Sequence, residues 1–203
     1  MFYRTVKGHI VPGIKPDRGM KTPLFSYPSY QYQVNDWSFK KKSLLNRINS
    51  QKFVRTSIQT FESDRSTNNK SYVHYFQDLI RPELFEFCKE AEVSCSMTDC
   101  WTVRYRKGDY QTVHNHKSFG FSLVLYVEYD PKVHTPTTFV CPWQDPRTDT
   151  TSLVCPQDVC EGTLFIVPSY TLHYATPNLS NKTRTVISAD LLPKLPEHQT
   201  INN

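Results

Sequence analysis

With 203 residues, the chain is long enough for one sizeable hydrophobic core and too short for two full enzymatic domains. Hydrophobic residues make up 38% of it, aromatic residues 13% and charged residues 21%, which excludes a disordered chain and favours a β-rich core. Apart from three lysines at residues 40–42, the charges behind the net +5 are scattered, so a solvated surface is favoured over a nucleic-acid-binding stripe.

The N-terminus carries Lys, His, Pro and Gly where a signal peptide has an apolar run, and no stretch of about twenty apolar residues follows. The sequence therefore predicts a cytoplasmic protein that does not contact a membrane. Its six cysteines contain no Cys-x-x-Cys pair, which argues against a zinc knuckle and against a secreted disulfide framework. We expect reduced, mostly buried thiols, with a bridge between Cys155 and Cys160 left open.

The first part of the chain is expected to support a core. Residues 1–35 are rich in Pro, Gly, Tyr and Lys and predict extended or irregular chain draped over that core. Residues 36–53 predict a short amphipathic helix with Asp36 or Ser38 as its N-cap.

A polar loop is predicted at residues 62–71, and helical spacing of apolar residues returns at residues 71–93. Ser71 is the candidate cap of this second helical segment. Pro82 predicts a kink, or a further helix that begins there.

The second half of the chain consists of short alternating segments separated by Gly, Pro, Asp and Asn, without strand–helix–strand alternation. This texture indicates a mainly β fold, an antiparallel sandwich or barrel. We expect an N-terminal arm and helical support at residues 1–97 and a catalytic β core at residues 98–203, together one compact domain.

Histidines in the β core are candidate metal ligands. In "HNH", His114 and His116 would project from the same face of a strand and could chelate one cation, although such a pair is more often a surface or hydrogen-bonded pair. His173 ends "EGTLFIVPSYTLH", where a glycine turn at Gly162 leads into an apolar strand, and a barrel could bring it opposite the first pair. Taken alone, His173 is more readily a hydrogen-bonded histidine near a turn. Three imidazoles on one face of a metal would leave positions open for substrate and oxygen, as in non-haem iron centres.

Arg184 follows His173 by eleven positions, which leaves room for a turn that returns the next strand alongside. An arginine aimed into an apolar barrel needs an anionic partner, because its unpaired burial is costly. A planar carboxylate would match its fork bidentately. A surface arginine at the start of a strand is an equally good interpretation of this residue alone.

These motifs together resemble the double-stranded β-helix of the iron(II) and 2-oxoglutarate (2OG)-dependent oxygenases, a jelly-roll, cupin-like barrel. They resemble most the prolyl-hydroxylase-like subgroup found in bacteria and in tailed phages of marine cyanobacteria. The resemblance covers residues 98–191, through "WTVRYRKGDYQTVHNH", "FSLVLYV", "EGTLFIVPSYTLHYATPN" and "RTVIS", while residues 1–95 match only loosely. If the chain is phage-encoded, its compartment would be the host cytoplasm.

The resemblance implies a full set of site residues and cofactors. The implied ligands of iron(II) are His114, His116 and His173. Arg184 would bind the distal carboxylate of 2OG, the hydroxyl of Tyr126 would join that arginine, and Tyr105 would line the pocket. The implied reaction uses O2 and couples the oxidative decarboxylation of 2OG to the hydroxylation of a substrate.

Two positions depart from the pattern. Most such oxygenases have Asp or Glu where this chain has His116, and Ser where it has Val186. A neutral imidazole in place of a carboxylate removes one negative charge from the metal, so nickel, copper or zinc would compete well with iron. Asp109 could supply the missing carboxylate, but it lies five positions before His114 and would face the other side of an unbroken strand.

Other interpretations use the same residues. A cupin-type three-His enzyme without 2OG fits the glycine and histidine spacing, but the glutamate that cupins carry a few residues after the pair is absent. A non-catalytic module would hold a structural or sensory metal, yet structural zinc is normally closed by four ligands and no fourth is evident. The letters "HNH" also name a nuclease family, in which they denote dispersed residues.

Trp143 and residues 142–151 could border the pocket, although a solvated loop is the simpler interpretation. The substrate, whether protein, nucleic acid or small molecule, and the oligomeric state, including a homodimer, are left open.

Overall fold

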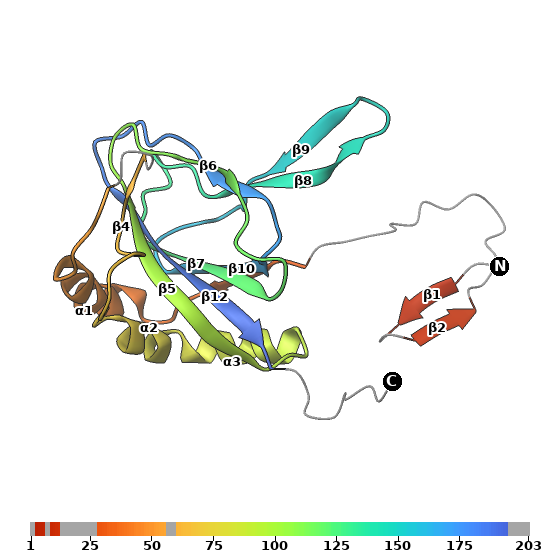
Figure 1. The fold of residues 1–203 in the computed structure, drawn as a ribbon, viewed down its shortest axis with the longest axis horizontal. Helices are drawn as coiled ribbons and strands as arrows, with labels where there is room; N and C mark the ends of the chain where they lie inside the picture. The colour runs from red at the N-terminus through yellow and green to blue at the C-terminus, as the bar shows by residue number, and fades with distance from the viewer. Residues whose placement is uncertain (1–2, 7–8, 13–27, 56–59, 195–203) are drawn as a thin grey trace.

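The computed structural model describes residues 3–6, 9–12, 28–55 and 60–194 (Figure 1). Its elements in chain order are β1 (Tyr3–Val6), β2 (His9–Pro12), β3 (Tyr30–Gln33), α1 (Trp37–Asn49), β4 (Glu62–Ser63), α2 (Val73–Leu79), α3 (Arg81–Glu90), β5 (Cys95–Tyr105), β6 (Gln111–His114), β7 (Phe121–Glu128), β8 (Thr138–Asp145), β9 (Thr150–Val154), β10 (Thr163–Pro168), β11 (His173–Ala175) and β12 (Arg184–Pro193). Strands dominate, and the expected mainly β fold is confirmed.

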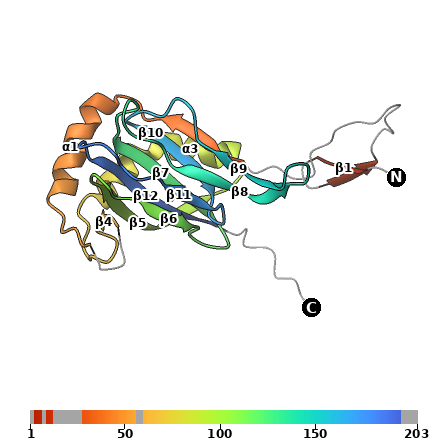
Figure 2. The same ribbon diagram turned by 90° about the horizontal axis from the view of Figure 1, so that it is seen from above.

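Two antiparallel sheets form the barrel. The larger has the strand order β3-β10-β7-β12-β5-β4, and the smaller has the order β6-β11-β8-β9 (Figure 2). The last long strand, β12, lies between β5 and β7 and pairs with both. From β5 to β12, strands that follow one another along the chain alternate between the sheets, except that β8 and β9 both lie in the smaller one. This is the winding of a double-stranded β-helix. The β1–β2 hairpin forms a separate two-stranded sheet.

The central strands of the larger sheet are buried on both faces, because successive side chains point to opposite sides. On β12, Ile187 and Ala189 join the main core between this sheet and the helices. Val186, between the sheets, joins a second cluster with Trp101 and Tyr126. This alternation gives the barrel an inner face that is free to carry polar site residues.

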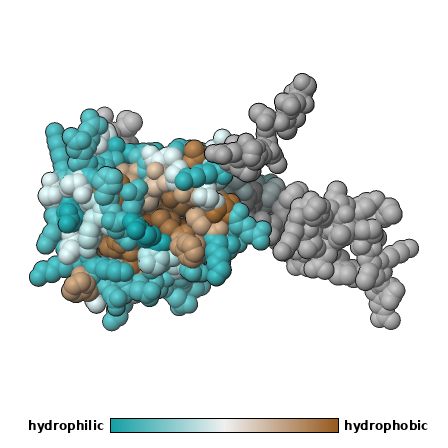
Figure 3. Space-filling model, turned by 90° about the horizontal axis from the view of Figure 1, so that it is seen from below, coloured by the Kyte–Doolittle hydropathy of each residue, from teal (hydrophilic) through white to brown (hydrophobic). Residues whose placement is uncertain are grey.

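The three helices lie along the outer face of the larger sheet (Figure 1). Figure 3 shows this side of the molecule, where hydrophobic side chains gather near the centre and hydrophilic ones surround them. The predicted second helix at Pro82 is confirmed, since α3 begins at Arg81 with the proline in its first turn.

The helix caps differ from the expectation. Asp36 is the N-cap of α1, but its side chain makes no capping hydrogen bond. Ser71 is not a cap, because α2 begins at Val73 with Tyr72 as its N-cap, and the Ser71 hydroxyl instead accepts a hydrogen bond from the Gln51 amide at 2.8 Å. Packing of the buried apolar residues, rather than side-chain capping, stabilises these helix starts.

Two segments expected to be loops are partly ordered strand. In the polar segment 62–71, β4 pairs with β5, and the fully buried Asp64 accepts a hydrogen bond of 2.7 Å from the backbone N–H of Thr102. In the segment 142–151, β8 and β9 form a hairpin that projects from the barrel (Figure 1). The polar composition of both segments indicated loops. They form strands because each has a neighbouring strand to pair with.

The six cysteines are free thiols, so Cys155 and Cys160 do not form a bridge. The expectation of mostly buried thiols was wrong: Cys100 alone is buried, Cys160 is exposed and the other four are half-buried. Among the described residues, no helix is long and apolar enough to cross a membrane.

Candidate active site

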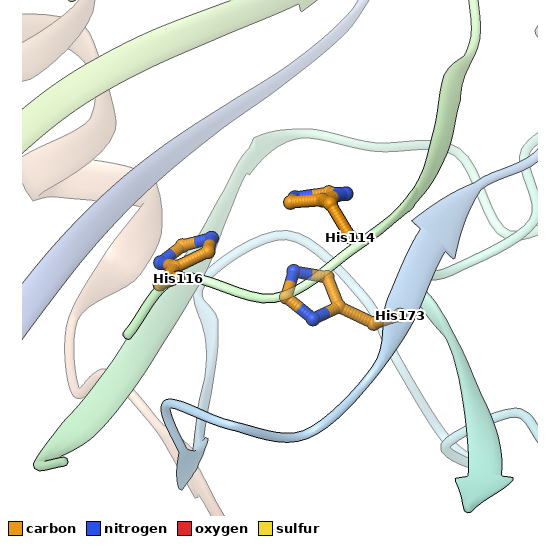
Figure 4. A group of neighbouring side chains, drawn as sticks. All are labelled: His114, His116 and His173. Atoms are coloured by element: carbon orange, nitrogen blue, oxygen red, sulfur yellow. The ribbon is translucent and has the colours of Figure 1, made fainter. Parts of the chain in front are cut away.

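Three imidazole rings meet at one end of the barrel (Figure 4). His114 at the end of β6 and His173 at the start of β11 are direct partners in the antiparallel ladder, and their ring centroids are 4.3 Å apart. The ring centroid of His116 is 5.6 Å from that of His114 and 5.1 Å from that of His173. One nitrogen from each ring lies within 4.8 Å of the others, and this is the only such His, Cys, Asp or Glu group among the described residues.

His116 reaches this position by a route that the strand argument did not predict. Strand β6 ends at His114, so Asn115 and His116 already belong to the following loop. The backbone N–H of His116 donates a hydrogen bond of 3.0 Å to the carbonyl of Ser169, just beyond β10. A loop anchored to the turn after β10, rather than alternation along one strand, brings His116 beside His114.

Each ring is held through its Nδ1 atom. Nδ1 of His114 lies 2.8 Å from the carbonyl of Thr112, and Nδ1 of His173 lies 2.8 Å from the carbonyl of Thr171. Nδ1 of His116 lies 2.8 Å from Oδ1 of Asp190. Carbonyl and carboxylate oxygens only accept, so every Nδ1 carries the hydrogen, and in the neutral ring Nε2 keeps its lone pair. The donor set therefore has the tautomer that metal binding through Nε2 requires.

Burial keeps two of these rings neutral. It lowers the pKa of His173 to about 3, assisted by the neighbouring His114. Burial also lowers the pKa of His114 below its usual value, against the opposing hydrogen bond to Thr112. Neutral imidazole is the form that binds a metal, so no proton has to leave these rings near neutral pH.

The donor set suits a divalent transition metal. Imidazole nitrogen is a good ligand for iron, nickel, copper and zinc, and three protein ligands leave further coordination positions open. The three rings also lie on a cavity whose wall contains Phe139, Phe165 and Val167, so the open positions face a partly apolar interior. The residues present therefore fit a non-haem metal centre with room for a second ligand.

Arg184 lies on the same cavity. Its side chain is buried, with a residue exposure of 2%, and it stacks on the ring of its ladder partner Tyr105 at 4.3 Å. Nη1 donates to the carbonyl of Thr135 at 2.6 Å and Nη2 to that of Thr176 at 3.3 Å, while Nε has no hydrogen-bond partner. No acidic side chain forms an ion pair with Arg184 in the described part of the chain. A buried guanidinium without a countercharge is a strong site for an anionic ligand.

Both predicted tyrosines line this cavity. The hydroxyl of Tyr126 accepts a hydrogen bond of 2.9 Å from the backbone N–H of Thr137. The hydroxyl of Tyr105 donates to Oε1 of Gln111 at 2.7 Å, and Nε2 of Gln111 lies 3.1 Å from Nε2 of His114. Gln111 was missed by sequence reasoning, because nothing in its spacing marks it as a link between a tyrosine and a ligand.

Two buried aspartates are candidates for the carboxylate that this chain lacks at the position of His116. Asp109 is buried and bound by both terminal nitrogens of Arg55, at 2.9 and 2.5 Å, and it is not part of the histidine group. Asp190, which the sequence argument did not single out, contacts His116 instead. Its pKa is lowered because the hydrogen bond from His116 and the nearby Lys117 outweigh the opposing effect of burial.

The barrel strands β5 to β12 also match a known protein family. Residues 99–190, somewhat less than half of the chain, match the family model described as "Putative 2OG-Fe(II) oxygenase". Over these residues the chain is similar to the 2OG-Fe(II) oxygenases. Enzymes of that family use iron(II), 2OG and O2, and the match favours the oxygenase interpretation over the cupin-type and non-catalytic alternatives. A search of curated proteins found no match.

Solved structures share the fold of this chain. The viral collagen prolyl hydroxylase of Paramecium Bursaria Chlorella virus-1, in complex with 2OG, is 14% identical with a TM-score of 0.54, over 83% of this chain and 96% of that one. HygX from Streptomyces hygroscopicus, with nickel and 2OG bound, is 11% identical with a TM-score of 0.63, over 82% and 83%. A Pseudomonas putida prolyl-4-hydroxylase is 14% identical with a TM-score of 0.51, over 82% and 94%. At such identities the likeness shows the fold alone.

Proposed function

We propose that this oxygenase binds iron(II) through Nε2 of three histidines, binds 2OG through Arg184, and hydroxylates a substrate that is not yet identified. The proposed iron ligands are His114, His116 and His173. The observation that carries the proposal is that three clustered imidazole rings and one buried guanidinium without an acidic partner among the described residues line the same cavity.

Arg184 is proposed to hold the distal carboxylate of 2OG. Its two terminal nitrogens already donate to backbone carbonyls, which fixes the plane of the guanidinium. A carboxylate in the cavity would supply the countercharge that the buried cation lacks, and the hydroxyl of Tyr126, on the same wall, could donate to its second oxygen. The ring of Tyr105 packs on the guanidinium and restricts its rotation.

Iron(II), when bound, supplies the chemistry that couples decarboxylation of 2OG to hydroxylation of a C–H bond. The protein holds the rings in one tautomer and lines part of the cavity with apolar side chains. Phe139 and Phe165 contact each other at 5.3 Å between ring centroids, and Phe139 also contacts the ring of His173 at 5.9 Å. These aromatic rings form an apolar wall of the cavity beside the proposed metal position.

The direct test is an anaerobic titration of iron(II) with 2OG. Binding of both should give a metal-to-ligand charge-transfer band, and admission of O2 should release succinate. We expect His173→Ala to lose the band and succinate formation. His74→Ala, which removes an exposed histidine of α2, is the control and should retain both. An absent band in the wild-type protein, or an unchanged band in His173→Ala, would contradict the proposal.

We also propose a cytoplasmic location, in the cytoplasm of the host cell if the chain is phage-encoded. Six free thiols support a reducing compartment. Protein, nucleic-acid and small-molecule substrates are all compatible with this proposal, as are a monomer and a homodimer.

A further inference from the structure

We infer that Asp190 is a positioning residue of the metal centre, which orients His116 and supplies, from behind that ring, the negative charge that the three ligands themselves lack. The inference rests on the proposed function, because it takes the three histidines to be the metal ligands. Asp190 is not one of the motif residues on which the resemblance in the sequence rests.

The first support is the difference between the three rings. His114 and His173 each donate Nδ1–H to the carbonyl of the residue two positions earlier in the chain, Thr112 and Thr171. His116 instead donates Nδ1–H to a carboxylate that lies 74 positions away. A hydrogen bond to a charged acceptor is about twice as strong as one to a neutral acceptor and makes the opposite ring nitrogen more basic. His116 should therefore be the strongest donor of the three.

The second support is how firmly the fold holds the carboxylate. Asp190 is buried, with an exposure of 1%, and it lies on β12 directly opposite Ser122 of β7. The hydroxyl oxygen of Ser122 lies 3.5 Å from Oδ1. Oδ2 makes no hydrogen bond of good geometry, but the ammonium of Lys117 lies 3.2 Å from it, and at this distance the ion pair is the contact that matters. Contacts to both oxygens thus restrict rotation of the carboxylate.

The third support is electrostatic. Three neutral imidazoles bring no charge to a divalent ion, and a buried uncompensated charge is costly. In the described part of the chain, Asp190 is the only carboxylate hydrogen-bonded to any of the three rings. Most oxygenases that the sequence resembles carry a carboxylate at the position of His116. In this chain the carboxylate would lie behind the ligand His116 instead of binding the metal itself. Its hydrogen bond to Nδ1 would make Nε2 of His116 more basic.

The test is a double-mutant cycle read out as metal affinity. Iron(II), and cobalt(II) as a spectroscopic substitute, would be titrated anaerobically without 2OG into wild-type protein, Asp190→Asn, His116→Asp and the double variant. In the wild-type background, Asp190→Asn should weaken metal binding by about 10–100-fold, because the charge behind His116 is lost. In the His116→Asp background the same change should strengthen binding, because it removes a second carboxylate that repels the new ligand.

The effect of Asp190→Asn on metal affinity should thus have opposite signs in the two backgrounds. If Asp190 had only a structural role, the change would weaken metal binding in both. Asp64→Asn is the matched control, since it removes a fully buried carboxylate away from the histidines and should leave metal affinity unchanged. Urea unfolding of each variant would verify the fold. If Asp190→Asn does not fold, the comparison of His116→Asp with the double variant still gives the second half of the cycle.

Wild-type affinity in Asp190→Asn, or equal losses in both backgrounds, would overturn the inference alone. Absence of metal binding by the wild-type protein would overturn the proposed function and the inference together. The two failures are therefore distinguishable in one set of titrations.

Discussion

Arg184 and Asp190 lie on the same inner face of β12, six positions apart, and both are almost completely buried. At about 3.3 Å per residue, the strand holds the Cα atoms of these two residues roughly 20 Å apart. Arg184 lies beside the tyrosines of the proposed 2OG site, and Asp190 lies behind His116. One strand thus carries the charged residues of both ends of the candidate site, and its pairing with β5 and β7 fixes their separation.

Arg184→Met should weaken 2OG binding without lowering the stability of the folded protein. We expect the affinity for 2OG to fall by about 100-fold or more, because the charged fork is lost. The free energy of unfolding without ligand should stay equal or rise by about 1 kcal/mol, because a buried charge without an acidic partner is removed. Titration of the charge-transfer band and urea unfolding measure the two effects. A large loss of stability would show that Arg184 has mainly a structural role.

Tyr126→Phe should weaken 2OG binding by about threefold to tenfold, the value of one ordinary hydrogen bond of about 1 kcal/mol. The ring would remain in the core, so the urea midpoint should move little. Tyr129→Phe is the control: its hydroxyl donates to the carbonyl of His134 and does not line the cavity. Equal effects of the two changes on 2OG affinity would argue against a direct role for Tyr126.

The metal-free protein should lose stability as the pH falls from about 6.5 towards 3. Burial lowers the pKa of His173 to about 3 in the folded state, whereas its unfolded value is about 6.5. Between these values the unfolded chain binds a proton that the folded chain does not, so acid favours unfolding. The contribution is at most about 1.4 kcal/mol per pH unit.

Urea unfolding at a series of pH values, with a chelator present, measures this slope. His173→Gln should have a shallower slope over the same range, because the titrating ring is gone. The exposed His74 provides the control, and His74→Gln should retain the wild-type slope. Parallel curves for wild-type protein and His173→Gln would contradict the assignment of the slope to His173.

Gly162→Ala should destabilise the protein by more than about 2 kcal/mol. Gly162 has a φ of +82°, and an added Cβ would lie 2.6 Å from the Trp37 ring, so backbone strain and overlap combine. Gly108 has a similar φ of +86° with open space around its Cβ position, so Gly108→Ala should cost only the backbone term of about 1–2 kcal/mol. Thermal or urea unfolding compares the two, and equal losses would refute the predicted overlap with Trp37.

Sequence by itself determined the parts of this protein that depend on local pattern. Alternating apolar residues predicted the strands, the proline at residue 82 marked the start of α3, and a turn at Gly162 preceded β10. His114, His173 and Arg184 were singled out because their residue types are rare in an apolar barrel and their spacing matched a known order of motifs. Their roles as ligands stay predictions, but their convergence on one cavity is observed.

Only the tertiary structure decided the contacts that join distant segments. His116 leaves β6 and is positioned by the carbonyl of Ser169, and its partner Asp190 comes from the last strand. The link from Gln111 to Tyr105 and the projecting β8–β9 hairpin were likewise invisible in the local pattern. The reason is physical: periodicity reports which face of a strand is buried, whereas a hydrogen bond between strands depends on register and loop path, which are set only when the two sheets pack together.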